Sequence, residues 1–328
     1  MPNDSEPGRS AGTDTGFEPV SPHAVRYIKL GPGGAWESDC LDSGTIRWGM
    51  GSNPYELAAA GDWDAVKQAY RGQGVSPATA TGFTREIREF YTLGPNCLWI
   101  TFARDHLWWA FSEPSVTVVT GEAGTEPRAI RPVLGRWRKD DIRGLPLRNH
   151  DLSSRLTQLA AYRGTICNVS ATDYLVRRIN GQEEPIVAAA RIARDGLSKA
   201  VEALIRHLHW ADFELFVDLL FARAGWRRVS ALGGRMKDLD LVIEQPLTGE
   251  RASVQVKSTA DQRVLDACVS TFANSASANH FFFVCHSSPG PLVAPALANG
   301  TVHIWNVEEL AVQAVDQGLT GWLMEKAG

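Results

Sequence analysis

The hydrophobic and polar positions along the chain change their period several times, and each change marks a predicted element. Near-alternating runs predict strands at 24–30 (AVRYIKL), 45–51 (TIRWGMG), 97–111, 115–121 (SVTVVTG) and 128–135 (RAIRPVLG). Helical spacing predicts helices at Pro54–Arg71 and Ala80–Tyr91. Residues 23–150 are therefore predicted to form a small α+β domain, mostly strands with two or three helices.

The run at 97–111, CLWITFARDHLWWAF, predicts a hairpin whose turn is centred on Arg104–Asp105. Side chains alternate along a strand, so Leu98 and Trp109 share one face, which we expect to be the core. The opposite face then carries Trp99 and Trp108, either packed under another element or available for binding.

The pattern turns helical from Asp151 to His209, which predicts a helical connector. A second domain follows from Trp210. Its first helix has Asp212 as the expected N-cap and Gly225 as the stop. After it come predicted strands at 226–232, 280–286 and 302–306, a hairpin at 238–258, and helices at 263–275, within 287–300 and at 307–318. Helices that alternate with short strands predict an α/β sandwich whose sheet is partly parallel.

The composition, with 44% hydrophobic and 21% charged residues, is typical of a folded protein of about two domains. The polar residues 1–22 are predicted to be a disordered tail. The net charge of -4 means that any nucleic-acid surface must be local. Five scattered cysteines predict no disulfide frame or zinc site, and the absence of long apolar runs predicts a cytoplasmic protein without membrane contact.

The hairpin DLDLVIEQPLTGERASVQVKS at 238–258 carries candidate chemistry. With Thr248–Gly249 at the centre of the turn, Asp240 lies opposite Lys257 and Val242 opposite Gln255. Alternation then places Asp240, Gln255 and Lys257 on one face. An ordinary surface salt bridge between Asp240 and Lys257 explains the pattern equally well, and Asp238 competes with Asp240 for the same role.

A fourth group comes from the helix at 212–224, where Glu214 lies at the margin of the buried stripe. Carboxylates and an amide oxygen form the hard-oxygen set that Mg²⁺ accepts. We therefore expect a metal site made by Asp240, Gln255 and Glu214. Lys257 would stand beside it to position water or to neutralise charge on phosphorus.

This half resembles the Mrr-type branch of the PD-(D/E)XK restriction endonucleases, over roughly Asp212 to Val315. The likeness follows an order: a helix with Phe213–Glu214, a Gly225–Trp226 end, an Asp that opens a strand, Gln-x-Lys closing the next strand, and the apolar strand HFFFVCHSS. The resemblance implies that Asp240, Gln255 and Lys257 form the nuclease centre and that Glu214 assists metal binding. Gln255 stands where many members have Glu, so one charge is lost that Glu214 can restore.

The first domain is rich in tryptophan and carries a basic segment. It faintly resembles PUA-like readers of the EVE, YTH and SRA type, through the strand RYIKL, a following tryptophan and the hairpin with WITF and LWWAF. That resemblance implies a β-barrel-type domain with an aromatic pocket for a flipped, modified base. The candidate pocket residues are Trp36, Trp48, Trp99 and Trp108. The candidate contacts to the DNA backbone are Arg136, Arg138, Lys139 and Arg143, although both sets could instead be core rings and a solvated face.

Together these features predict a modification-dependent endonuclease of the type IV restriction kind. It would use Mg²⁺, with Mn²⁺ able to replace it, and act on double-stranded DNA as a homodimer that forms at least on DNA. Two alternatives stay open: a non-catalytic reader of modified nucleic acid, and a nuclease that acts on RNA or unmodified DNA.

Overall fold

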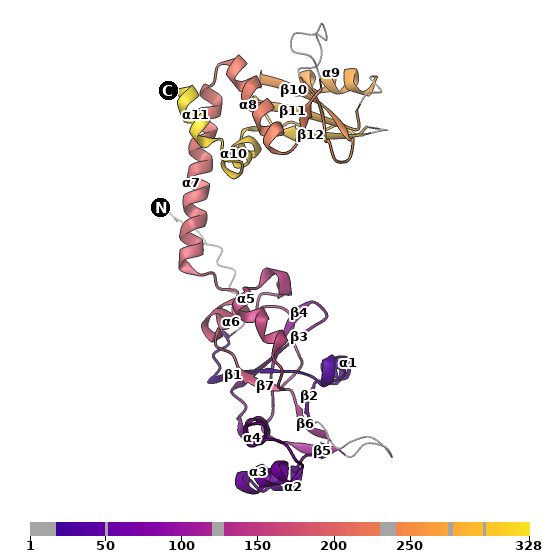
Figure 1. Ribbon diagram of the computed structural model, residues 1–328. Helices are drawn as coiled ribbons and strands as arrows, with labels where there is room; N and C mark the ends of the chain where they lie inside the picture. Colours follow the sequence, from indigo (N-terminus) through magenta and orange to yellow (C-terminus); the bar gives the residue numbers. More distant parts are fainter. Residues whose placement is uncertain (1–17, 50–51, 120–127, 230–240, 275–277, 298–299) are drawn as a thin grey trace, which may run out of the picture. The chain divides into compact units, whose positions relative to one another are not determined.

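The computed structural model of the chain (Figure 1) describes residues 18–49, 52–119, 128–229, 241–274, 278–297 and 300–328. The chain divides into two compact units, with the boundary between Glu184 and Pro185. Most of the predicted tail, residues 1–17, lies outside the described residues. Val20 in the next segment exchanges two hydrogen bonds with the Asn180 side chain, at 2.7 and 3.0 Å.

The first unit holds two sheets. Their strands are β1 (Ala24–Ile28), β2 (Thr45–Trp48), β3 (Cys97–Ala103), β4 (His106–Phe111), β5 (Thr117–Val119), β6 (Arg128–Pro132) and β7 (Ile166–Asn168). Its α-helices are α1 (Glu37–Ser43), α2 (Tyr55–Ala59), α3 (Trp63–Gly72), α4 (Pro77–Thr92), α5 (Ser154–Thr157) and α6 (Thr172–Ile179). The strand orders are β4-β3-β1-β7 and β2-β6-β5, and neither sheet closes into a barrel in the described part of the chain.

The β3–β4 hairpin has the predicted register, with Ala103 paired to His106. Arg104 and Asp105 form the turn with φ of 50° and 62°, the left-handed values of a tight hairpin turn. Both faces of the hairpin are buried, each in its own hydrophobic cluster. Of the two alternatives for the face that carries Trp99, packing under another element is the one found at Trp99, which is fully buried.

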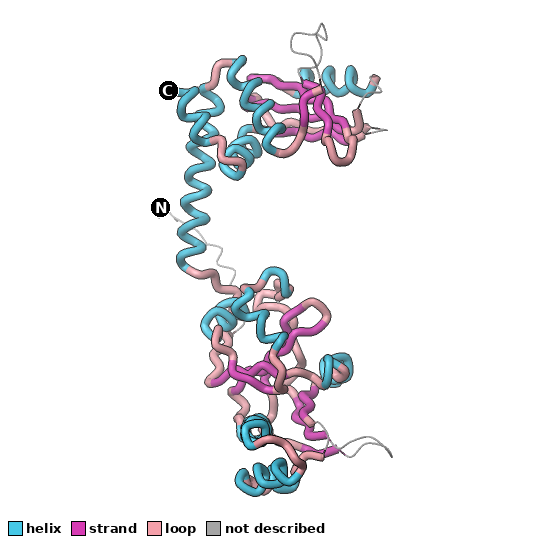
Figure 2. The backbone as a smooth tube through the Cα atoms, viewed as in Figure 1, coloured by secondary structure: helices cyan, strands magenta, loops and turns pink. Residues whose placement is uncertain are grey.

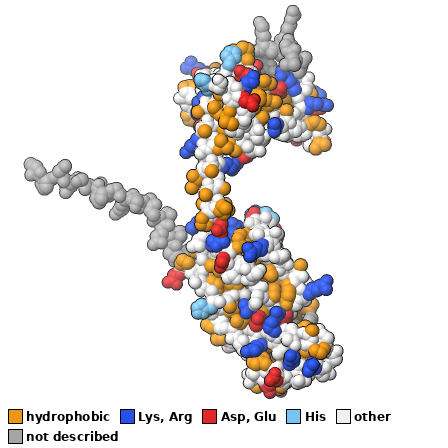
Figure 3. Space-filling view, turned by 60° about the vertical axis from the view of Figure 1, so that its left-hand side comes forward, with side chains coloured by type: hydrophobic (Ala, Val, Ile, Leu, Met, Phe, Trp, Pro, Cys, Tyr) orange, Lys and Arg blue, Asp and Glu red, His pale blue; other side chains and the backbone are white. Residues whose placement is uncertain are grey.

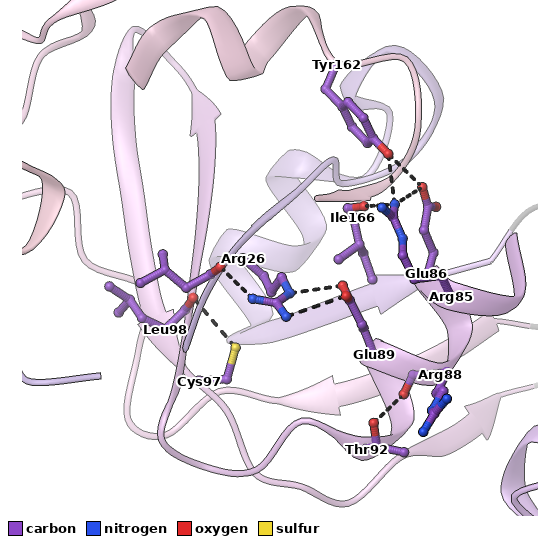
Figure 4. Close-up of polar contacts among 11 residues, drawn as sticks. Arg26, Arg85, Glu86, Arg88, Glu89, Thr92, Cys97, Leu98, Tyr162 and Ile166 are labelled. Atoms are coloured by element: carbon purple, nitrogen blue, oxygen red, sulfur yellow. Dashed lines mark hydrogen bonds and ion pairs between the residues drawn. The ribbon is translucent and has the colours of Figure 1, made fainter. Parts of the chain in front are cut away.

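Charged side chains fix α4 to its surroundings (Figure 4). Glu89 accepts a hydrogen bond from Arg26 Nε at 3.0 Å, which ties α4 to β1. Glu86 is buried and accepts hydrogen bonds from the Tyr162 hydroxyl and the Thr165 N–H at 3.3 and 3.1 Å. These bonds connect α4 to the segment that leads into β7, and β7 pairs with β1.

That pairing changes the expected domain limits. The predicted connector, residues 151–209, is divided in the structure, because its first part contributes β7 to the first unit's sheet. Its last part is one helix of the second unit, α7 (Pro185–His207). Figure 3 shows hydrophobic side chains along α7, where Ile186 and Ile192 are 75% and 72% exposed.

The second unit is a sheet flanked by helices (Figure 2). Its strands are β8 (Arg227–Arg228), β9 (Leu241–Glu244), β10 (Arg251–Thr259), β11 (His280–Ser287) and β12 (Thr301–Trp305). Its helices are α7, α8 (Trp210–Arg223), α9 (Gln262–Ala273), α10 (Val307–Asp316) and α11 (Thr320–Ala327). The strand order is β12-β11-β10-β9-β8; β10, β11 and β12 are parallel, and β9 is antiparallel to β10.

The apolar runs of β10 and β11 are explained by helices on both faces. One face carries Val254, Val256 and Val284 into a cluster with α8 and α10. The other carries Phe281 and Phe283 into a cluster with α9. This is the α/β sandwich that the sequence predicted, with a mixed sheet.

Two local expectations were wrong. The N-cap of α8 is His209 instead of Asp212, because the helix begins one turn earlier. The segment 288–297 contains no helix, which is consistent with Pro289, Pro291 and Pro295, since proline removes main-chain donors and restricts the preceding residue. No helix in the described ranges is long and apolar enough to cross a membrane.

Candidate functional site

Strand β10 carries two of the predicted nuclease residues. Gln255 pairs in register with Phe283 of β11, and Lys257 pairs with Cys285. Since alternate residues point to the same side, Gln255 and Lys257 share one face. Gln255 is 3% exposed, whereas Lys257 is half-buried near the carboxyl end of the strand. The predicted sharing of a face by these two residues is present in the fold.

The register of the β9–β10 hairpin differs from the expectation. Val242 pairs with Ser253 instead of Gln255, and Leu241 pairs with Val254. The difference arises in the turn: Gln245 N–H donates to the Glu250 carbonyl at 2.8 Å, so the loop is centred one residue before Thr248–Gly249. The predicted pairing of Asp240 with Lys257 falls outside the described residues, because β9 is described only from Leu241.

Asp240 itself, and its competitor Asp238, lie outside the described residues. Asp240 directly precedes Leu241 in the chain. In the described part of the chain, no group of three His, Cys, Asp or Glu side chains could hold a metal ion.

Glu214 lies on the exposed side of α8. The buried stripe of this helix, which includes Phe213 and Val217, packs in the same cluster as Val254 and Val256. That cluster covers the face of the sheet opposite to Gln255. However, the Phe213 ring contacts the His286 ring with 4.6 Å between centroids. The first turn of α8 therefore meets the carboxyl end of β11, the edge toward which Lys257 lies.

A pocket of about 460 Å³ opens at this carboxyl edge, which we call the edge pocket. Its polar lining comes from Arg206 at the end of α7, the end of β11 and the start of α10: Arg206, His286, Ser287, Ser288, Asn306 and Glu308. Cys285, the register partner of Lys257, also lines it. Open α/β sheets bind ligands beyond the carboxyl ends of their parallel strands, as this pocket would allow.

Burial shifts the pKa values of two titratable groups in the edge pocket, His286 and Cys285. Burial and, to a smaller extent, the Arg206 charge lower the pKa of His286, so its imidazole is neutral at pH 7. Burial raises the pKa of the Cys285 thiol, which keeps it protonated and a poor nucleophile. His286 Nδ1 is 2.9 Å from Ser287 Oγ, and Nε2 is buried without a hydrogen-bond partner among the residues the structure describes.

The first unit has a second pocket, of about 560 Å³, that unites several predicted nucleic-acid residues. It is lined by Trp108, Arg136, Trp137, Arg138, Lys139, Asp140, Ile142, Arg143 and Gly144, and we call it the basic pocket. Lys139 Nζ lies 6.0 Å from the centre of the half-buried Trp108 ring. An indole and four cations in one concave surface suit a phosphate chain with an adjacent base.

The other three predicted pocket tryptophans lie elsewhere. Trp99 is fully buried and Trp48 is 4% exposed, so neither offers an open ring to a base. Their assignment to a base pocket is corrected to a role in the core, where both rings pack against Phe90. Trp36 is half-buried, with the Arg128 guanidinium 4.7 Å above its ring. Its indole lies against Gly31, where a Cβ would be 2.7 Å from the ring.

Comparison with known proteins agrees with the second unit's assignment. Residues 205–312, about a third of the chain, match the Mrr_cat family, described as restriction endonuclease. This part of the chain therefore carries a restriction-endonuclease catalytic domain, which supports a nuclease that acts on DNA. No curated protein matches the chain.

One solved structure, "DNA modification-dependent restriction endonuclease AspBHI", is similar at 12% identity, with 87% of this chain and 80% of that chain covered. Its TM-score of 0.28 is too low to support any conclusion about this chain.

The sequence did not single out Arg206 or His286. The only signal was the polar sequence CHSS that ends the apolar strand, together with a histidine inside an otherwise hydrophobic run.

Proposed function

We propose that this protein is a Mg²⁺-dependent endonuclease that hydrolyses phosphodiester bonds of double-stranded DNA after its first unit recognises a modified base. The observation that carries the nuclease half is the coincidence of the family match at 205–312 with Gln255 and Lys257 on one face of β10. The fold around them supplies the expected order of helix, hairpin, apolar strand and helix.

In this proposal Asp240, Gln255 and Glu214 would hold the metal ion, since all three offer the oxygen ligands that Mg²⁺ prefers, and Mn²⁺ could replace it. When bound, the ion would polarise the phosphodiester and lower the pKa of water. The Lys257 ammonium would neutralise the charge that builds on the phosphorus oxygens and orient the attacking water. The half-buried position of Lys257 supports this role, because a partly dehydrated cation interacts more strongly with a phosphate.

Recognition of the modified base is assigned to the basic pocket. Trp108 would stack on the base, while Arg136, Arg138, Lys139 and Arg143 would contact the backbone phosphates. Stacking on one ring recovers about 1–3 kcal/mol, which offsets part of the cost of extruding a base. Trp36, half-buried beside Arg128, is another ring of this unit that is not fully enclosed.

A double-strand break requires two nuclease centres, so we propose that the protein acts as a homodimer, at least on DNA. The exposed hydrophobic side chains of α7 supply an apolar surface that favours such pairing.

The test is cleavage of plasmids that carry 5-methylcytosine, 5-hydroxymethylcytosine, glucosylated cytosine or N6-methyladenine, beside unmodified plasmid. Each is incubated with Mg²⁺ or with EDTA, and with the wild type, Lys257→Ala or Lys199→Ala. Lys199 is an exposed lysine on α7 and serves as the matched control.

We expect cutting that needs Mg²⁺, Lys257 and one modification, and that Lys199→Ala leaves unchanged. Equal cutting of unmodified plasmid would keep the nuclease and discard the modified-base reader. Binding of modified DNA without any cutting would favour a non-catalytic reader.

A further inference from the structure

The edge pocket contains donors that the nuclease centre does not use. His286 is 8% exposed, and its Nε2 has no hydrogen-bond partner among the described residues. A buried polar atom without a hydrogen-bond partner destabilises the fold, and a ligand that reached it would offset part of that cost. The neutral ring, with Nδ1 facing the Ser287 hydroxyl at 2.9 Å, can carry its proton on Nε2 and donate it.

The start of α10 adds main-chain donors. The first N–H groups of a helix have no acceptor inside the helix. The capping box uses two groups here: Asn306 N–H donates to Glu309 Oε2, and Glu309 N–H donates to Asn306 Oδ1, both at 3.0 Å. Val307 and Glu308, whose N–H groups the capping box does not use, both line the pocket at the positive end of the helix dipole.

Charge in the pocket is set by two opposed groups. Arg206 is 43% exposed and lies 3.9 Å from the Glu308 carboxylate, which is 61% exposed. Arg206 also pairs with Glu202 on its own helix at 3.3 Å. Arginine has five N–H donors, so the Arg206 guanidinium can still donate to a ligand in the pocket that it lines. The Glu308 carboxylate, in contrast, repels an anion there.

We propose that the edge pocket binds a backbone phosphate of the DNA, next to the phosphate that is cut, through Arg206, His286 and the first N–H groups of α10. The pocket shares Cys285 with the position beside Lys257, so it borders the proposed nuclease centre. A phosphate is the anion that matches a guanidinium, a neutral N–H and a helix N-terminus together. The inference rests on the proposed DNA substrate and would make the pocket a positioning site.

The test measures binding of the full-length protein to a short fluorescent duplex in EDTA, so that cleavage plays no part. Each backbone phosphate is replaced in turn by a neutral methylphosphonate, and the salt dependence of binding is recorded. The variants are Arg206→Gln, His286→Phe, His286→Gln and Glu308→Gln. Lys199→Gln, on the same helix as Arg206 but outside the pocket, is the matched control.

We expect Arg206→Gln to weaken binding about five- to tenfold and to reduce the slope of log K against log salt by about 0.9, the value for one phosphate. One methylphosphonate should weaken the wild type but not Arg206→Gln, because the contact has already been lost. His286→Phe should weaken binding, and His286→Gln, which keeps an N–H donor, should restore part of the affinity. Glu308→Gln should bind more tightly.

The proposal is overturned if every methylphosphonate weakens Arg206→Gln as much as the wild type, or if Glu308→Gln weakens binding. Arg206 and Glu308 are exposed enough for their variants to fold, so the test does not depend on the His286 variants. If the expected binding changes occur but no DNA is cleaved in Mg²⁺, the proposed nuclease activity is contradicted and the phosphate site is supported. If DNA is cleaved but the binding changes do not occur, the nuclease activity is supported and the phosphate site is contradicted. If the protein binds no duplex at all, both proposals are contradicted.

Discussion

At the scale of single residues, Arg131 is a charged side chain buried in the core of the first unit. Its guanidinium is fully buried and donates to the carbonyls of Phe90, Leu93 and Glu113 at 2.7, 2.8 and 2.9 Å. Burial lowers the pKa of Arg131, yet arginine stays charged. Only a planar fork can reach three such acceptors, so the three carbonyls explain why arginine occupies this core position.

We expect Arg131→Lys to lower the free energy of unfolding by about 3 kcal/mol, because the ammonium cannot span the three carbonyls and stays buried with fewer hydrogen bonds. Urea unfolding followed by tryptophan fluorescence measures the change. The exposed Arg71, changed to Lys, is the control and should change stability little. A loss below about 1 kcal/mol would show that the carbonyls are satisfied in another way.

Glu86 gives a prediction about pH. Burial raises its pKa, despite the lowering effects of the Thr165 N–H and Arg85. The folded state thus holds the Glu86 proton to higher pH than the unfolded chain does. The stability from this group is present at low pH and is lost as pH rises through the raised pKa.

Glu86→Gln removes that titration. The unfolding free energy of the variant minus that of the wild type should therefore increase between pH 4 and pH 7. Urea unfolding at several pH values measures the difference, with Glu56→Gln, on the exposed side of α2, as the control. A difference that decreases over this range would mean that Glu86 is stabilised as a carboxylate.

At the scale of elements, how well the sequence predicted each hairpin depended on its turn. Arg104–Asp105 is a two-residue turn between continuous runs, which leaves one register for β3 and β4. The six residues 245–250 form a longer loop that allows several registers, and its internal hydrogen bonds choose among them. The alternation still assigned Gln255 and Lys257 to one face, because they lie two residues apart on one strand and share a face in any register.

The helix α10 supports a prediction about its cap. Asn306→Ala removes the acceptor for the Glu309 N–H and should lower the unfolding free energy by about 1 kcal/mol. Asn306→Ser keeps a cap oxygen and should lose much less. Urea unfolding measures both variants. Equal free energies of unfolding for Asn306→Ala and Asn306→Ser would show that the capping box contributes little to stability.

At the scale of the whole molecule, local pattern predicted the second unit better than the first. Its apolar strands and helices alternate simply, whereas β1 pairs with both β3 and β7, which are far apart in sequence. The burial of individual tryptophans also could not be predicted from the local sequence pattern. Trp99 and Trp108 share a face of the hairpin, yet the first is enclosed beneath α4 and the second lines the basic pocket. The edge pocket likewise forms only when α7, β11 and α10 meet.

Each unit has its own hydrophobic clusters, two in the first and two in the second. We therefore expect two calorimetric transitions for the full-length protein. Arg131→Lys should move only the transition of the first unit, and Asn306→Ala only that of the second, because each change alters contacts within one core. A single transition that either variant shifts would instead mean that the units unfold as one. Independent units would let the basic pocket and the proposed nuclease centre be altered separately, which is the condition for testing recognition in one unit and hydrolysis in the other.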